Sequence, residues 1–235
     1  MVLQKLRSVV DGKEFLLALS LFFIAWLLVL ISVCPIAWYK ARTTTPCDAS
    51  YEGKEVETKF VVTLWRYHSC NPVPLACSNQ CTNKRWSELW KIGCGGVGPQ
   101  GEELYCYNFD SAGEMTAAFL VLGLCISSLV FPLSFMRLKQ LNVKFLSQVR
   151  IGKILLVVMS FCWACCIMSF VWYPYIADAK SWEEQNGGTM HLGVGWYLVL
   201  TSLPLFFISI VFFVLDFAKV SNRQSYEETR EEETF

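Results

Sequence analysis

Four long stretches of the chain are almost free of charged residues. Apolar residues fill them without the regularly spaced polar positions that a half-buried helix or strand would show. About 20 apolar residues in an α-helix cross a hydrocarbon core of about 30 Å, and each stretch is at least that long. The pattern therefore predicts four transmembrane helices, at residues 15–39, 115–136, 154–176 and 192–215.

The first stretch has a second interpretation, because Lys5, Arg7 and Lys13 precede it as they would precede the apolar core of a secretory signal peptide. Its apolar run exceeds the usual length of about 7–15 residues, and Ser32-Val33-Cys34-Pro35 is a poor cleavage site. We therefore interpret it as an uncleaved first helix. Cleavage would leave three spans.

Charges in the connecting segments predict the orientation. The connection at 137–153 carries five basic residues and no acidic one, whereas the connection at 177–191 carries Lys180 beside acidic residues. Lys and Arg are enriched in short cytoplasmic loops. We therefore expect both termini in the cytoplasm, with an acidic C-terminal tail that is solvated and disordered. The cytoplasmic segments are then 1–14, 137–153 and 216–235, and the outer loops are 40–114 and 177–191.

Eleven cysteines divide between the first outer loop and the spans. An even number in an exterior loop predicts a disulfide framework, and the residues themselves leave its pairing open. The loop cysteines are Cys47, Cys70, Cys77, Cys81, Cys94 and Cys106. A zinc site made by Cys77, Cys81 and Cys94 with His68 is the alternative, which an oxidising exterior disfavours.

The first outer loop carries strand and turn signals, so we expect it to fold. Residues 55–65 are rich in β-branched side chains, alternate in part and lack Gly and Pro, and 104–109 has a similar pattern. Asn71-Pro72 and residues 94–99 are typical of turns. The predicted fold class is therefore membrane α-helical: a four-helix bundle with a small, disulfide-stapled, extracellular antiparallel β-sheet.

Candidate chemistry is sparse. No ionisable residue falls inside a predicted span, since Arg137 is assigned to a loop and Asp216 to the edge of the fourth span. His68 and His191 lie in different loops without a nucleophile constellation. The zero net charge argues against a nucleic-acid partner. We expect no catalytic residue, no metal ligand, no cofactor and no enzymatic activity. Cysteines inside the third span are interpreted as packing residues: Cys162, Cys165 and Cys166.

Trp38, the dipeptide Leu64-Trp65, and Cys70 and Cys81 with ten residues between them resemble the first-loop motif of the claudin-like superfamily. That motif begins with a Trp and continues as Gly-Leu-Trp and two cysteines. Thr63 stands here at the glycine position. The resemblance implies a claudin-like fold and a disulfide between Cys70 and Cys81.

Val62-Thr63-Leu64-Trp65 followed by Cys70 also resembles the signature of amastins, the tetraspan surface proteins of kinetoplastid parasites. The Gly193–Tyr197 opening of the last span and the aromatic stretch Trp163–Tyr173 look amastin-like as well. Val61 and Arg66 stand where the signature has a cysteine and a glycine.

The amastin resemblance implies a non-enzymatic, multi-pass protein of the plasma membrane. Its role would lie in surface structure, adhesion or host–parasite interaction. Besides the lipid bilayer, its expected partners are a host ligand, another surface protein, or a second copy bound in cis through the first outer loop. The alternative is a channel, a transporter or an auxiliary subunit with a claudin-like fold.

Overall fold

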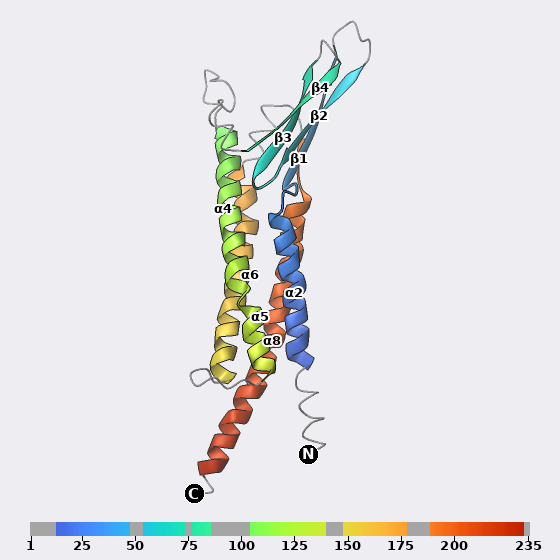
Figure 1. Ribbon diagram of the computed structural model, residues 1–235. Helices are drawn as coiled ribbons and strands as arrows, with labels where there is room; N and C mark the ends of the chain where they lie inside the picture. The colour runs from blue at the N-terminus through green and yellow to red at the C-terminus, as the bar shows by residue number, and fades with distance from the viewer. Residues whose placement is uncertain are drawn as a thin grey trace. The chain divides into compact units, whose positions relative to one another are not determined.

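The fold consists of long helices and one sheet in a computed structural model that describes residues 13–47, 54–73, 77–85, 104–139, 148–177 and 189–232 (Figure 1). The helices are α2 (Lys13–Val33), α4 (Leu104–Ser127), α5 (Val130–Leu138), α6 (Gln148–Ala177) and α8 (Val194–Glu232). The strands are β1 (Tyr39–Pro46), β2 (Glu55–Val62), β3 (Arg66–Val73), β4 (Ser78–Arg85) and β5 (Thr189–Leu192).

Helices in the described ranges include four segments that are long and apolar enough to cross a bilayer. At 1.5 Å per residue, their 21 to 29 residues exceed the thickness of a hydrocarbon core. The expectation of a multi-pass membrane protein with four spanning helices is therefore confirmed. The segments are Lys13–Val33, Ser111–Leu138, Gln148–Pro174 and Val194–Asn222.

The first helix is shorter than its apolar stretch. We expected it to reach Tyr39, but it ends at Val33, shortly before Pro35. Proline lacks the N–H that a continuing helix needs and disfavours helical geometry in the preceding residue. The chain then enters β1, so Tyr39 belongs to the sheet and not to the first helix.

Two expectations for local structure are wrong. Residues 104–109, predicted as a strand, form the first turns of α4, because extending an existing helix adds hydrogen bonds without a new nucleation cost. The acidic tail, predicted to be disordered, continues α8 to Glu232. Arg223 and Glu227 lie four residues apart in it, a spacing at which opposite charges favour a helix.

Prolines mark the interruptions in the second span. Between α4 and α5 the helix is broken at Ser128 and Leu129, just before Pro132. The ring of a helical proline clashes with the carbonyl four residues earlier, here that of Ser128. Pro204 lies inside α8, which remains a single helix.

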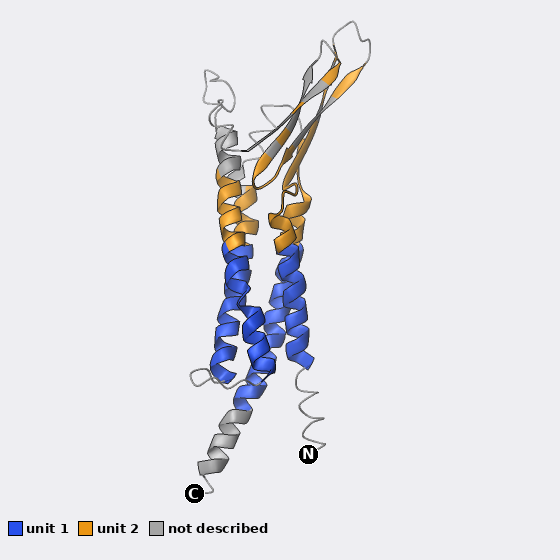
Figure 2. Ribbon diagram, in the orientation of Figure 1, with its two compact units in different colours: residues 1–29, 122–166, 201–235 blue, residues 30–121, 167–200 orange. Residues whose placement is uncertain are grey.

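The chain forms two compact units, shown in blue and orange in Figure 2. Unit 1 comprises Met1–Val29, Leu122–Cys166 and Thr201–Phe235, and unit 2 comprises Leu30–Val121 and Ile167–Leu200. Aromatic pairs fill the interior of unit 1. Phe22 meets Phe206 edge-on at 5.1 Å, and Phe15 lies 5.9 Å from Phe213 between ring centroids. The Ser209 hydroxyl donates to the Ala18 carbonyl at 2.6 Å, which satisfies it inside an apolar bundle.

Unit 2 contains a five-stranded antiparallel sheet with the strand order β4-β3-β2-β1-β5. The expected small antiparallel sheet is thus confirmed. Within the first predicted strand, β2 ends at Val62, and Asn71-Pro72, predicted as a turn, lies in β3. Pro72 is tolerated because β3 pairs with β2 only up to Cys70, so Pro72 lies beyond that ladder.

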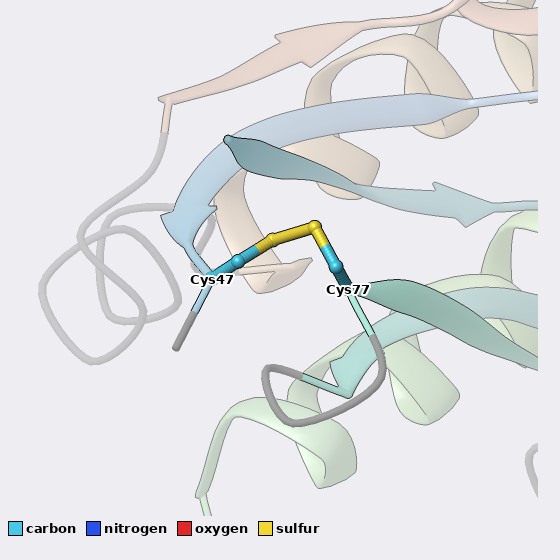
Figure 3. Close-up of a disulfide and its surroundings, with 2 residues drawn as sticks. All are labelled: Cys47 and Cys77. Carbon is cyan, nitrogen blue, oxygen red and sulfur yellow. A yellow bond between two sulfur atoms is a disulfide. The ribbon is translucent and has the colours of Figure 1, made fainter. Parts of the chain in front are cut away.

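A disulfide between Cys47 and Cys77 staples the sheet (Figure 3). Cys47 follows β1 and Cys77 precedes β4, so the bond links strands that are not neighbours in the sheet. Closing a loop of 30 residues in the unfolded chain contributes about 3–4 kcal/mol in the chain-entropy account. Cys77 has a φ of 46°, a left-handed conformation that costs a non-glycine residue about 1–2 kcal/mol. The disulfide holds Cys77 in that turn.

Candidate functional site

The motif residues of the first outer loop converge in unit 2 at the end of α2. Trp38 is fully buried, and its backbone N–H donates to the Val62 carbonyl at 2.7 Å. Its indole N–H donates to the Ser32 carbonyl at 3.0 Å. The last carbonyls of any helix lack partners within the helix. Trp38 therefore satisfies one of those carbonyls while joining the sheet.

Trp65, in the turn between β2 and β3, makes a similar hydrogen bond to the end of α2. Its indole N–H donates to the carbonyl of Val33, the last residue of α2, at 2.7 Å. The Thr63 hydroxyl accepts hydrogen bonds from the backbone N–H groups of Trp65 at 3.2 Å and Arg66 at 2.9 Å, which closes the turn between β2 and β3. Thr63 thus places Trp65 against the helix end.

A tight backbone approach completes this turn. Leu64, between the two contacts, is buried. A methyl group added at Gly113 of α4 would lie 2.7 Å from the Leu64 carbonyl oxygen, so only glycine lets the helix pass so close. The segment 62–65 therefore joins β2, β3, the end of α2 and α4, all within unit 2.

Tyr173 of α6 packs against the first residues of β1. Its ring meets Trp38 edge-on at 4.7 Å and stacks on Tyr39 at 5.5 Å between centroids. Tyr173 is fully buried, so these three rings form one aromatic cluster. Such ring pairs contribute about 0.5–1.5 kcal/mol each beyond the burial of their area.

A proline in α6 leaves one carbonyl available for a contact with α8 in the same unit. Pro174 lies inside α6, so the carbonyl four residues earlier, that of Phe170, loses its usual helical donor. The indole N–H of Trp196 in α8 donates to that carbonyl at 3.4 Å, and the rings of Phe170 and Trp196 stack at 4.6 Å. Trp196, which the amastin-like segment contains, thus replaces the missing donor.

Glycines in the same segment admit the β1 backbone and Trp38. The N–H of Gly193 donates to the Trp38 carbonyl at 2.6 Å, and that of Gly195 donates to the Ala37 carbonyl at 2.9 Å. A methyl group at Gly195 would lie 2.5 Å from Nε1 of Trp38. The start of α8 is therefore fitted to the same tryptophan that binds α2.

The loop cysteines are placed in part. Cys47 and Cys77 are bonded to each other, and Cys81 is disulfide-bonded as well. Cys70 and Cys81 are direct register partners in β3 and β4, and the pair that the claudin resemblance implies stays a prediction. Cys106 lies in the first turn of α4, and Cys94 falls outside the described residues. Because Cys77 and Cys81 are oxidised, they are not thiolate ligands for the alternative zinc site.

The sequence did not predict that Arg137 and Asp216 form a pair. Arg137, assigned to the basic loop, lies at the end of α5 within a spanning segment and is only 8% exposed. It forms an ion pair of 2.5 Å with Asp216 of α8, which is equally buried. The Arg137 guanidinium also lies over the rings of Phe15 and Phe213, 4.9 and 5.0 Å from their centroids. The sequence placed these residues in a loop and at a span edge, whereas here both lie within the candidate spans, with Arg137 at the end of one.

The hydrophobic pattern of the sequence could not reveal the pair of Arg137 and Asp216. A charged residue at the end of an apolar run can lie in a loop outside the span or be buried against another helix, and the pattern is the same in both cases. The cysteines of α6 lie where the sequence placed them, with Cys162, Cys165 and Cys166 buried and outside any disulfide. Gly123 of the second span packs on one of them, since a methyl group there would lie 3.1 Å from the Cβ of Cys165. Close helix packing accounts for these thiols.

Comparison of the chain with family models and with curated proteins found no match. The geometry of the two units is therefore the basis for assigning a function.

Proposed function

We propose that the chain is a non-enzymatic, multi-pass protein of the cell surface that resembles amastins and has a claudin-like architecture. Its helices anchor it in the plasma membrane with both termini in the cytoplasm. Its sheet is the part that contacts a partner, in adhesion, surface structure or host–parasite interaction. The sheet lies outside the cell, and the motif residues attach it to the helices.

The observation that carries this proposal is the double indole contact of Trp38 and Trp65 with the end of α2. A loop that only connected two helices would not need two tryptophans to satisfy adjacent carbonyls of the first helix. In these positions they fix the starting points of β1 and β3 at the membrane boundary. Trp65 remains 44% exposed, at a depth where tryptophans favour the interface between lipid and water.

Charge distribution supports the orientation. The connection between the second and third spans and the first turns of α6 together carry Lys139, Lys144, Arg150 and Lys153 without an acidic residue, which is typical of the cytoplasmic side. The sheet, at the other ends of the same helices in chain order, then lies outside the cell. An oxidising exterior also matches the disulfide between Cys47 and Cys77.

The proposal is tested with the full chain expressed in cells, carrying one epitope tag between Asp48 and Ala49 and a second tag at the C-terminus. We expect antibody to reach the first tag on intact cells and the second only after permeabilisation. Cells displaying the protein should bind partner cells or beads more than cells displaying a chain with an unrelated sequence at 54–85. Labelling of the first tag only after permeabilisation, or equal binding by both chains, would contradict the proposal.

A second candidate function, in a channel or transporter or an auxiliary subunit, is favoured by the buried pair of Arg137 and Asp216. Ionisable side chains inside spans are costly and often mark pathways for ions or protons. This candidate is tested by ion flux into liposomes that contain the purified protein. Flux that disappears in Asp216→Asn, while the variant keeps its fold, would favour this function. Equal flux in protein-free liposomes would exclude it.

A further inference from the structure

The two faces of the sheet differ in chemistry. Side chains alternate along a strand, and register partners on adjacent strands share a face. One face is covered, because Tyr39, Ala41, Val62 and Met190 are all buried. Tyr39 is the register partner of Val62, and Ala41 that of Met190, so these residues define a single buried face.

The opposite face is basic. Lys40, Arg42, Arg66 and His191 are exposed, and His68 is half-buried. Lys40 is the register partner of His191 and of Val61, which in turn is the partner of His68, so these positions lie in one row across the sheet. We call the following residues the basic face: Lys40, Arg42, Arg66, His68 and His191.

Basic residues also stand directly opposite one another in the ladder. Arg42 is the register partner of Lys59, and Arg66 is the register partner of Arg85. Like charges in direct cross-strand positions destabilise a sheet. On this side of β2, Lys59 is followed by Glu57 and Glu55, whose register partners are Thr44 and Pro46. The basic side chains thus cluster at the end of this side of the sheet that contains Arg66, Lys40 and His191. Such a cluster of exposed basic side chains favours an anionic partner.

The dimensions of the basic face distinguish between possible anions. Arg66 and Arg42 lie two strands apart and four residues apart along the ladder, which is about 10 Å across the strands and about 14 Å along them. β1 leads away from the end of α2 (Figure 1). A headgroup layer is only about 5–7 Å thick on each side of the core, so one layer of lipid headgroups would not reach the whole basic face.

We propose that the basic face binds a linear anionic polysaccharide through its sulfate or carboxylate groups. An extended polymer with repeated charges can follow the oblique line from Arg66 past Lys40 to Arg42. The strand positions that share this side of the described sheet carry no Trp, Tyr or Phe on which nucleic-acid bases would stack. Only Val61 adds an apolar side chain to its central row, which gives a peptide little to anchor on. This partner assignment rests on the proposed exterior location of the sheet.

The test uses the full chain in nanodiscs of phosphatidylcholine, with fluorescent heparin as the probe and neutral dextran as its uncharged counterpart. We expect heparin to bind at about 150 mM salt and dextran not to bind. The variant Lys40→Gln/Arg42→Gln/Arg66→Gln should lose affinity by about 3- to 100-fold, because each of the three exposed ionic contacts contributes a factor of about 1.5–5. The affinity of the wild-type chain should also fall steeply with added salt.

Two further variants give the result its specificity. Lys13→Gln/Lys139→Gln/Lys153→Gln removes as many exposed charges from unit 1 and should bind heparin as the wild-type chain does. Lys40→Arg/Arg42→Lys/Arg66→Lys keeps the charges and should retain the affinity. No binding of heparin, an unchanged affinity in the first variant, or an equal loss in the unit 1 variant would overturn the proposal. A wild-type chain that binds phosphatidylglycerol vesicles but not heparin, and a first variant that no longer binds those vesicles, would also overturn the proposal. That result would favour lipid headgroups as the partner.

This experiment is independent of where the sheet lies in a cell. Heparin binding by a chain whose loop tag is cytoplasmic would refute the proposed function and leave the anion site standing. A surface-exposed tag on a chain that never binds heparin would refute the anion site alone.

Discussion

At the scale of single residues, the two motif tryptophans perform one task in different surroundings. Both donate an indole N–H to the end of α2, but Trp38 is fully buried and Trp65 is 44% exposed. A carbonyl left without a donor in a buried site loses its hydration as well as its hydrogen bond. At an exposed site water replaces the lost donor. The same deletion should therefore have different consequences at the two positions.

The variant Trp38→Phe should lower the free energy of unfolding by about 1–3 kcal/mol, because the buried Ser32 carbonyl loses the indole donor. Trp65→Phe should cost less than about 1 kcal/mol. Unfolding of the purified chain by added detergent measures both. Equal losses in the two variants would contradict the capping role assigned to Trp38.

Arg137 and Asp216 offer a second test at this scale. Arg137→Gln or Asp216→Asn alone should lower the free energy of unfolding by about 3–5 kcal/mol, since each leaves a buried charge unpaired. The double variant Arg137→Met/Asp216→Leu should recover most of that loss. Unfolding measured on the two single variants and on Arg137→Gln/Asp216→Asn gives the coupling between the two sites. Additive losses in the double variant would show that the pair does not stabilise unit 1.

At the scale of elements, the sequence predicted those that local pattern determines. The spans follow from unbroken apolar runs, and β2 follows from alternation with β-branched side chains. β5 could not be predicted, because four residues carry too little pattern and the strand exists through its pairing with β1, far away in sequence. Residues 104–109 have the composition of a strand and became helix through the adjoining span.

Gly195 tests how closely α8 is fitted to the sheet. Gly195→Ala should destabilise unit 2 by about 1–3 kcal/mol, because the added methyl group would overlap the Trp38 indole, although alanine is the better helix former. Val194→Ala, at a 50% exposed neighbour, is the control and should change stability by less than about 0.5 kcal/mol. A neutral or stabilising Gly195→Ala would show that the contact is loose.

The disulfide framework gives a further prediction for the strands. A non-reducing peptide map should recover Cys47 with Cys77 and, from the register of β3 and β4, Cys70 with Cys81. Cys94 and Cys106 are then the remaining loop cysteines and should form the third pair. A peptide joining Cys70 to a cysteine of a span would be incompatible with the claudin-like assignment.

At the scale of the whole molecule, hydropathy alone determined the number of spans, whereas the partner of each polar group depended on packing. Arg137 shows the limit, because the sequence gives its position along a helix but not which helix it faces. The motif residues show the reverse: Trp38, Thr63, Leu64 and Trp65 were identified by resemblance. Their shared task became evident only when unit 2 brought them to the end of α2.

Thiol accessibility tests the placement of the whole chain in a bilayer. Cys34 and Cys125 are both free and exposed, but Cys125 lies inside the span Ser111–Leu138, where its neighbours would be lipid. A membrane-impermeant maleimide should therefore label Cys34 on intact cells and leave Cys125 unmodified. Cys34→Ser should abolish the labelling. Persistent labelling of that variant that disappears in Cys34→Ser/Cys125→Ser would mean that Cys125 contacts water and that the second span is misassigned.

The pairing of β1 with β5 sets an order for biosynthesis. β1 leaves the ribosome soon after the first span, but its partner β5 follows about 140 residues later, at the start of the last span. At about 5–20 residues per second, one edge of β1 stays without its neighbour for roughly 7–30 seconds. During that interval this edge of the nascent chain remains open. Completion of the sheet therefore waits until the first three spans and β5 have been synthesised.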